Sequence, residues 1–257
     1  MNTHIFIQAR LGSKRLPSKA LRKICNKTII ELMVERLRRV QNIQKIILVT
    51  GHEKDNSLLV EEARRLKIDY FCGSEENILD RFYKAQNFFK SDVIIRVMAD
   101  SPLIDHELIN EGLDTFFKLQ SKIDILSIDR VKSYPHGLNF QIFTSEALKK
   151  SWEEHFKKFN DLKKFDQEFI SPAMYMLVKK QFKNYDLIGK TDYSSIRLTL
   201  DYPEDFEVVK NIFEKIYPRK PNFVLKDILE VLDNNPKLLK INEKYHTESD
   251  FTINYEK

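Results

Sequence analysis

Cysteine, tryptophan and glycine are scarce in this sequence. Its 257 residues include two cysteines, one tryptophan and six glycines. Cys25 and Cys72 lie far apart without a second-ligand pattern, which argues against both a disulfide framework and a zinc site. No apolar run approaches membrane-spanning length, and the N-terminus has no signal-peptide hydrophobic region. We therefore expect a cytoplasmic protein in a reducing compartment, with no membrane partner.

Acidic residues are missing from the start of the chain, because the first one is Glu31. The whole sequence carries a formal charge of +5 with a pI near 8.9, which is only mildly basic. After Glu31 the cations alternate with Asp and Glu, so no continuous basic face with exposed aromatics is indicated. We therefore expect no nucleic-acid partner.

The basic N-terminal segment follows a short apolar run, Ile5–Ile7, that reads as a buried strand. It contains Gly12, Ser13 and Pro17, and its four cations are Arg10, Lys14, Arg15 and Lys19. A positive, turn-rich loop that leaves the end of a strand is where an α/β protein binds an anion, most often a phosphate. The alternative at this point is a solvated basic loop without a ligand.

Strand and helix patterns alternate with short links along much of the chain. This favours an α/β fold with a mainly parallel sheet and right-handed crossovers, in one domain spanning 1–257. A strand-rich excursion at about 123–145 is a candidate dimer contact, and 218–257 reads as a C-terminal helix and tail. The expected strands are 5–7, 45–50, 68–72, 92–98, 123–128, 138–143 and 195–201. The expected helices are 28–40, 56–66, 74–89, 106–119, 145–156, 167–179, 203–216 and 223–233.

Asp201 ends one of the expected strands, and Asp100 follows the end of another, 92–98, by two residues. Such a position at the carboxyl end of a strand is where open α/β sheets place ligands. The two side chains could share one Mg²⁺ with phosphate oxygens, since Mg²⁺ takes only one or two protein carboxylates. This suits attack by a substrate oxygen on an α-phosphate, with no protein nucleophile. The alternative for Asp100 is a simple turn cap.

Several segments resemble the cytidylyltransferases that activate 3-deoxy-manno-octulosonate and acylneuraminate acids, and most closely the spore-coat polysaccharide branch of that superfamily. The first segment is Gln8-Ala9-Arg10-Leu11-Gly12-Ser13-Lys14-Arg15-Leu16-Pro17-Ser18-Lys19. The others are Gly73–Ala85, Arg96–Asp105, Tyr134–Phe143 and Thr199–Phe206. The resemblance implies a three-layer α/β/α sandwich with a Rossmann-like sheet of the nucleotide-diphospho-sugar transferase type.

The resemblance also implies roles for individual residues. It implies that Arg10, Lys19 and Asp100 are catalytic residues and that Asp100 and Asp201 are metal ligands. Nucleotide contacts are implied for Ala9, Arg10, Leu11, Gly12, Ser13, Arg15, Lys19 and Arg81, with Lys14 assisting. Acceptor contacts fall on His136, Asn139 and Gln141. The implied reaction is Mg²⁺-dependent transfer of CMP from CTP to an acidic sugar, with release of pyrophosphate, for a surface glycan.

The chain departs from its relatives at several of these positions. Met98-Ala99-Asp100 replaces a usual Thr-Gly-Asp, and Phe169 stands where a histidine is usual. Relatives carry acids where this chain has His136, Asn139 and Gln141, so a less negative acceptor pocket and an anionic acceptor are expected. Two alternatives stay open. One is a glycosyltransferase of similar topology, although the sequence has no Asp-x-Asp. The other is a non-catalytic nucleotide-binding subunit.

Overall fold

The computed structural model describes residues 1–119, 122–158 and 171–246. Its main sheet has seven strands in the order β5-β4-β1-β6-β8-β7-β9. Strands β1, β4, β5 and β6 run parallel, whereas β8 is antiparallel to both β6 and β7. The strands are β1 (Thr3–Gln8), β4 (Lys45–Thr50), β5 (Asp69–Cys72), β6 (Val93–Met98), β7 (Ile125–Ser127), β8 (Phe140–Thr144) and β9 (Asn184–Asp186).

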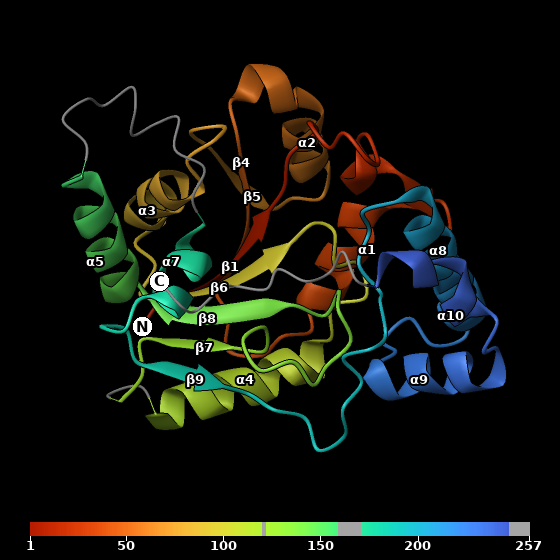
Figure 1. The fold of residues 1–257 in the computed structure, drawn as a ribbon. Coiled ribbons are helices and arrows are strands. Elements are labelled where there is room, and N and C mark those ends of the chain that lie inside the picture. The colour runs from red at the N-terminus through yellow and green to blue at the C-terminus, as the bar shows by residue number, and fades with distance from the viewer. Residues whose placement is uncertain (120–121, 159–170, 247–257) are drawn as a thin grey trace.

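Helices cover both faces of this sheet, which makes a three-layer α/β/α sandwich (Figure 1). The longer helices are α1 (Ile29–Leu37), α2 (Glu53–Arg65), α3 (Ile78–Phe89), α4 (His106–Leu119), α5 (Ser145–Phe156), α7 (Pro172–Val178), α8 (Pro203–Ile216) and α9 (Leu225–Asn234). Short elements are the hairpin β2 (Lys23–Ile24) and β3 (Lys27–Thr28), the helix α10 (Leu238–Ile241), and the 3₁₀ turns at Lys19–Leu21 and Glu243–Tyr245. Among the described residues, no helix is both long and apolar enough to cross a membrane.

Alternating side chains of β1, an inner strand of the sheet, divide the core into two parts. Ile5 and Ile7 of β1 pack on the side of α1, α2, α4, α8 and α9. Phe6 points the other way, into a second cluster with α3, α5 and α7. All three side chains are fully buried, as expected for a strand covered on both faces. The three-layer, mainly parallel fold expected from the sequence is therefore confirmed.

The expected strand at 195–201 is wrong. This segment makes one isolated bridge, between His136 and Arg197, and belongs to no strand. Its backbone pairs with loops instead: Leu198 N donates to His136 O at 2.6 Å and Leu200 N to Asp100 O at 2.8 Å. The alternating buried Leu198 and Leu200 mimic a strand pattern, but they pack an extended loop onto the core.

Other boundaries also differ from the expected ones. The edge strand β9 was not expected, and the strand-rich segment at about 123–145 contributes β7 and β8 to the main sheet. Helix α1 begins at Ile29, where the Thr28 side chain accepts a hydrogen bond from Glu31 N. The start of the helix expected at 167–179 lies outside the described residues, as does Phe169, and α7 is its described part.

Candidate functional site

Three distant segments meet at the carboxyl edge of the sheet. Strands β1 and β6 are parallel neighbours, and their last residues, Gln8 and Met98, are paired in register. Asp100 follows β6 by two residues. The Leu200 N–H and the Thr199 hydroxyl both donate to Asp100 O, at 2.8 and 3.2 Å. These bonds attach the loop that carries Asp201 directly to the end of β6.

Lys19 completes this cluster from the basic loop. Its Nζ lies 3.0 Å from Asp100 Oδ2, 3.0 Å from Asp201 Oδ1 and 2.8 Å from Leu200 O. Burial opposes a charge on Lys19, but the two carboxylates outweigh it, and the pKa of Lys19 is raised. Burial likewise acts to raise the pKa of Asp201, yet Lys19 and two arginines hold it below its usual value. Lys19 and Asp201 therefore stay charged together at neutral pH.

Arg15 is the other loop cation that reaches the cluster. Its guanidinium lies 3.1 Å from Asp201 Oδ1, donates to the Tyr202 hydroxyl at 3.2 Å and sits 4.8 Å from the centre of the Tyr202 ring. About half of the Arg15 side chain remains exposed, at 51%. Arg10 and Lys14, which precede Arg15 in the loop, are exposed to solvent. The loop therefore presents two cations at the carboxylates and two toward solvent.

A buried ion pair holds Asp201 in place, and the sequence reasoning missed it. Arg197 donates to both carboxylate oxygens of Asp205 at 2.9 Å, and these side chains are only 3% and 0% exposed. Asp205 Oδ2 also accepts from the backbone N–H groups of Asp201 and Tyr202, each at 3.0 Å. The sequence signal was Asp205 in the first turn of a helix that begins at Pro203.

The backbone of the basic loop is anchored by Asn56, a second residue that the sequence reasoning missed. Asn56 Oδ1 accepts from Leu11 N at 3.0 Å, while Nδ2 donates to His52 O at 3.1 Å and to Glu75 Oε2 at 3.0 Å. Asn56 is 1% exposed and leaves helical geometry, which kinks α2. A Cβ on Gly51 would lie 1.5 Å from Glu75 Oε2, so a larger residue there would displace the Glu75 carboxylate from this junction.

Arg81 lies apart from the Lys19 cluster. It is 1% exposed, and its Nη1 donates to Ser74 O at 2.9 Å. Burial, together with the charges of Arg10 and Arg96, lowers the pKa of Arg81 to about 10, against the opposing effect of Glu75. Arg81 Nε is buried without a hydrogen-bond partner. A buried guanidinium with a free donor is suited to a polar ligand group beside it.

The three predicted acceptor residues, His136, Asn139 and Gln141, have different hydrogen-bond partners. The Asn139 and Gln141 amides both donate to the Asp129 carboxylate. His136 bonds through its backbone to Ile196 and Leu198, and burial and the charge of Arg197 lower the pKa of its side chain. The expected loss of negative charge from this wall is therefore incomplete, because Asp129 supplies a carboxylate at the same place.

The donor set of the cluster fits a hard divalent cation. Asp100 and Asp201 come from separate loops, and each side chain keeps part of its surface exposed, 20% and 18%. Among the described residues, no three His, Cys, Asp or Glu side chains gather as a metal cage. Two carboxylates with room for water and phosphate are what Mg²⁺ usually takes, whereas Zn²⁺ prefers nitrogen and sulfur ligands.

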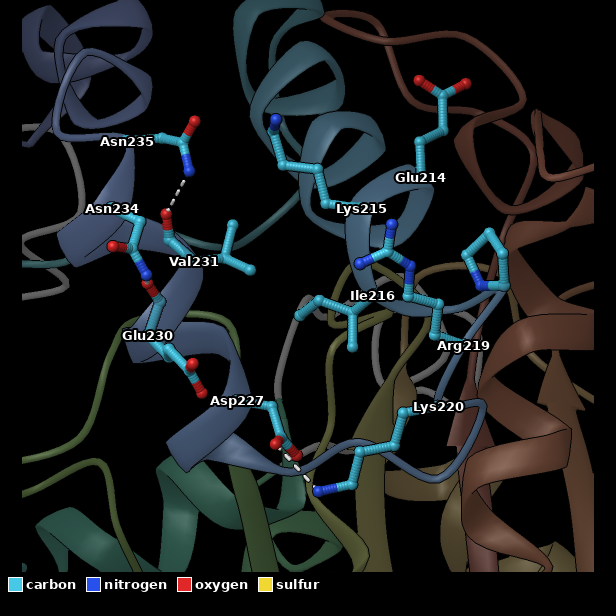
Figure 2. A pocket seen from close by; sticks show the side chains of 11 residues that line it. Glu214, Lys215, Ile216, Arg219, Lys220, Asp227, Glu230, Val231, Asn234 and Asn235 are labelled. Carbon is cyan, nitrogen blue, oxygen red and sulfur yellow. Dashed lines mark hydrogen bonds and ion pairs between the residues drawn. The ribbon is translucent and has the colours of Figure 1, made fainter.

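A surface cavity of about 620 Å³ lies well away from this cluster, between α8 and α9. Figure 2 shows its charged walls, where Lys220 pairs with Asp227. Lys215, Arg219 and Glu230 also line it, and none of the predicted site residues does. The cavity is therefore separate from the site at the carboxyl edge of the sheet.

The fold and the cluster define a class of protein: an α/β nucleotidyltransferase. Comparison with known proteins identifies the family within that class. The cytidylyltransferase family model matches residues 4–215, and the chain belongs to this family.

The chain is similar over more than nine-tenths of its length to individual proteins. It is 34% identical over 249 residues to an uncharacterized protein of Methanocaldococcus jannaschii, covering 95% of both chains. It is 28% identical to the spore coat polysaccharide biosynthesis protein SpsF of Bacillus subtilis, over 92% of this chain and 96% of that one. A solved cytidylyltransferase from Leptospira borgpetersenii superposes with a TM-score of 0.82 at 28% identity, covering 93% and 97%.

Proposed function

We propose that this enzyme transfers CMP from CTP to an acidic sugar in an Mg²⁺-dependent reaction that builds a surface glycan. In this reaction an acceptor oxygen bonds to the α-phosphorus of CTP. The bond from that phosphorus to the bridging oxygen breaks, pyrophosphate leaves, and the proton of an attacking hydroxyl passes to water. Alignment and charge stabilisation suffice for this step, so no protein nucleophile is needed.

The contact of Lys19 with both Asp100 and Asp201 is the observation that carries the proposal. When bound, Mg²⁺ would neutralise phosphate charge and be held by Asp100 and Asp201. Lys19, which contacts both carboxylates, would supply an ammonium that can donate to a phosphate oxygen at the same site. Arg10 and Arg15 extend the positive charge along the loop, where the rest of the triphosphate would lie.

The nucleoside would lie on the other side of the same loop. We assign its contacts to the segment from Ala9 to Ser13, including Leu11 and Gly12, and to Arg81. The Asn56 anchor supports the assignment to the loop, because it fixes the Leu11 backbone. We assign the acceptor to the wall of His136, Asn139 and Gln141.

The remaining features of the proposal concern the whole protein. We propose one nucleotidyltransferase domain over 1–257 that acts in the cytoplasm, with the region near 123–145 as the candidate contact of a homodimer. Its relatives support the sugar pathway: SpsF is a spore coat polysaccharide biosynthesis protein, and a 3-deoxy-manno-octulosonate cytidylyltransferase of Chlorobium chlorochromatii is 32% identical over 120 residues.

Pyrophosphate release tests the proposal. The protein is incubated with each nucleoside triphosphate, Mg²⁺ and a panel of acidic sugars, and we expect release with CTP that stops when EDTA removes the metal. Asp100→Ala should abolish release, while Asp233→Ala, the same change at an exposed position of α9, should not. CTP binding without turnover on any acceptor would favour a non-catalytic subunit. Transfer of sugar from a sugar nucleotide would favour a glycosyltransferase.

A further inference from the structure

A row of polar side chains crosses four neighbouring strands at the edge where the candidate site lies. Gln8, the last residue of β1, accepts from Arg96 Nε of β6 at 2.9 Å. Arg96 Nη1 donates to Gln141 Oε1 of β8 at 2.5 Å, and the Gln141 amide donates to Asp129 beyond β7. The row connects the start of the basic loop to the acceptor wall.

Asp129 is the charged group at the far end of this row. Its donors are all neutral: the amides of Asn139 and Gln141, and the Ser127 hydroxyl at 3.2 Å. The oxygens of both amides are already used, one by Arg96 and the other by Gly137 N at 2.7 Å. Asn139 and Gln141 therefore orient the carboxylate, and Asp129, which is partly exposed, carries the negative charge of the wall.

The sheet fixes how far Asp129 lies from the reaction centre. Strand β8 separates β6 from β7, so the ends of β6 and β7 are two strand spacings apart. Two spacings are about 10 Å, which is the span of a sugar with a short side chain. Asp100 follows β6 and Asp129 follows β7, both at the same edge. An acceptor whose reacting oxygen lies at Asp100 would therefore extend its far end toward Asp129.

We propose that Asp129 selects the acceptor by its far end, an inference that rests on the proposed cytidylyl transfer. A carboxylate accepts hydrogen bonds from hydroxyl or ammonium groups and repels a second anion. The acceptor is thus a sugar acid whose end remote from the reacting oxygen bears hydroxyl or amino groups. A phosphate at that end is rejected. The acid group of the sugar lies toward the loop cations, and the polyol end lies against Asp129.

A matched pair of probes tests this without any variant. The wild-type enzyme is assayed with CTP, Mg²⁺ and either 3-deoxy-manno-octulosonate or its 8-phosphate, and with N-acetylneuraminate as a second hydroxyl-rich acid. We expect kcat/KM to be at least about tenfold higher without the phosphate, the effect of one lost charged hydrogen bond. An equal kcat/KM for 3-deoxy-manno-octulosonate and its 8-phosphate, or a higher value for the 8-phosphate, overturns the proposal.

The variant Asp129→Asn then separates recognition from folding. It should raise the acceptor KM about tenfold and reduce the preference between the matched probes, while the KM for CTP stays within about twofold. Asp233→Asn on the exposed surface of α9 is the control, and rescue by Asp129→Glu supports a role for the charge. An unchanged acceptor KM in Asp129→Asn overturns the role of Asp129 but leaves cytidylyl transfer intact.

Two further results also decide the question. If calorimetry shows that CTP binds but none of the hydroxyl-rich acids is used, the acceptor assignment is overturned while nucleotide binding stands. If neither CTP binding nor pyrophosphate release is detected, the proposed function is overturned, and the role of Asp129 with it.

Discussion

Removing the buried guanidinium behind Asp201 should strongly destabilise the protein. Arg197→Met leaves the Asp205 carboxylate, which is 0% exposed, without its charged partner. Breaking a buried pair from one side costs about 3–5 kcal/mol, because the remaining charge stays out of water. That is a large share of the 5–15 kcal/mol that roughly spans the stability of a folded protein. For a chain of this size the melting temperature should fall by roughly 10 °C.

A double-mutant cycle measures the same interaction more directly. Asp205→Asn keeps an oxygen for the backbone N–H groups of Asp201 and Tyr202 but removes the charge. In urea unfolding, the Arg197→Met/Asp205→Asn protein should lose about 2–3 kcal/mol less than the sum of the two single variants.

Lys220→Met is the control for an exposed ion pair. Lys220 Nζ lies 2.8 Å from Asp227 Oδ1, with the Lys220 side chain 49% exposed, so its loss should stay below about 1 kcal/mol. A loss of stability in Arg197→Met no larger than in this control would contradict a strong buried ion pair. Single losses that simply add in the double variant would contradict it as well.

Two further variants and one titration probe the site itself. Asn56→Ala frees the Leu11 backbone and should weaken CTP binding about tenfold by calorimetry; an unchanged affinity would show that the anchor is dispensable. His136 should titrate by NMR below 6.5, since burial and Arg197 lower its pKa. Its contribution to stability is then complete above pH 6.5 and declines as the pH falls, and a midpoint above 6.5 contradicts this. Lys19→Met should lower kcat about 10²–10³-fold, whereas Lys23→Met, on the exposed hairpin, should change it less than about threefold; equal effects would count against Lys19.

The sequence predicted the fold best where buried, apolar segments form the inner strands of the sheet. Ile5–Ile7 and 92–98 are apolar enough to require central positions in the sheet, and parallel strands bring their carboxyl ends to one edge. The meeting of Lys19 with Asp100 followed from that geometry. Asp201 lies beside Asp100 for a different reason, since its segment is a loop bonded to Asp100 and not a strand.

Residues that act through other residues could not be predicted from the sequence in the same way. Asn56 looks like an ordinary helix residue, and only the fold brings Leu11 and Glu75 to its amide. The direction of the Asn139 and Gln141 amides depends on the register between β7 and β8, which places Ser127 opposite Gln141. Local patterns do not determine such register, so the role of Asp129 was not apparent.

Phosphorus NMR of CTP turnover detects both products of the proposed cytidylyl transfer. We expect wild-type protein with Mg²⁺ and a hydroxyl-rich sugar acid to convert CTP into equal amounts of pyrophosphate and a CMP-linked sugar. We also expect Asp100→Ala and Asp201→Ala each to abolish both signals, while Asp233→Ala retains them. Pyrophosphate and CMP-sugar signals that persist undiminished in both the Asp100→Ala and Asp201→Ala proteins would contradict the proposal.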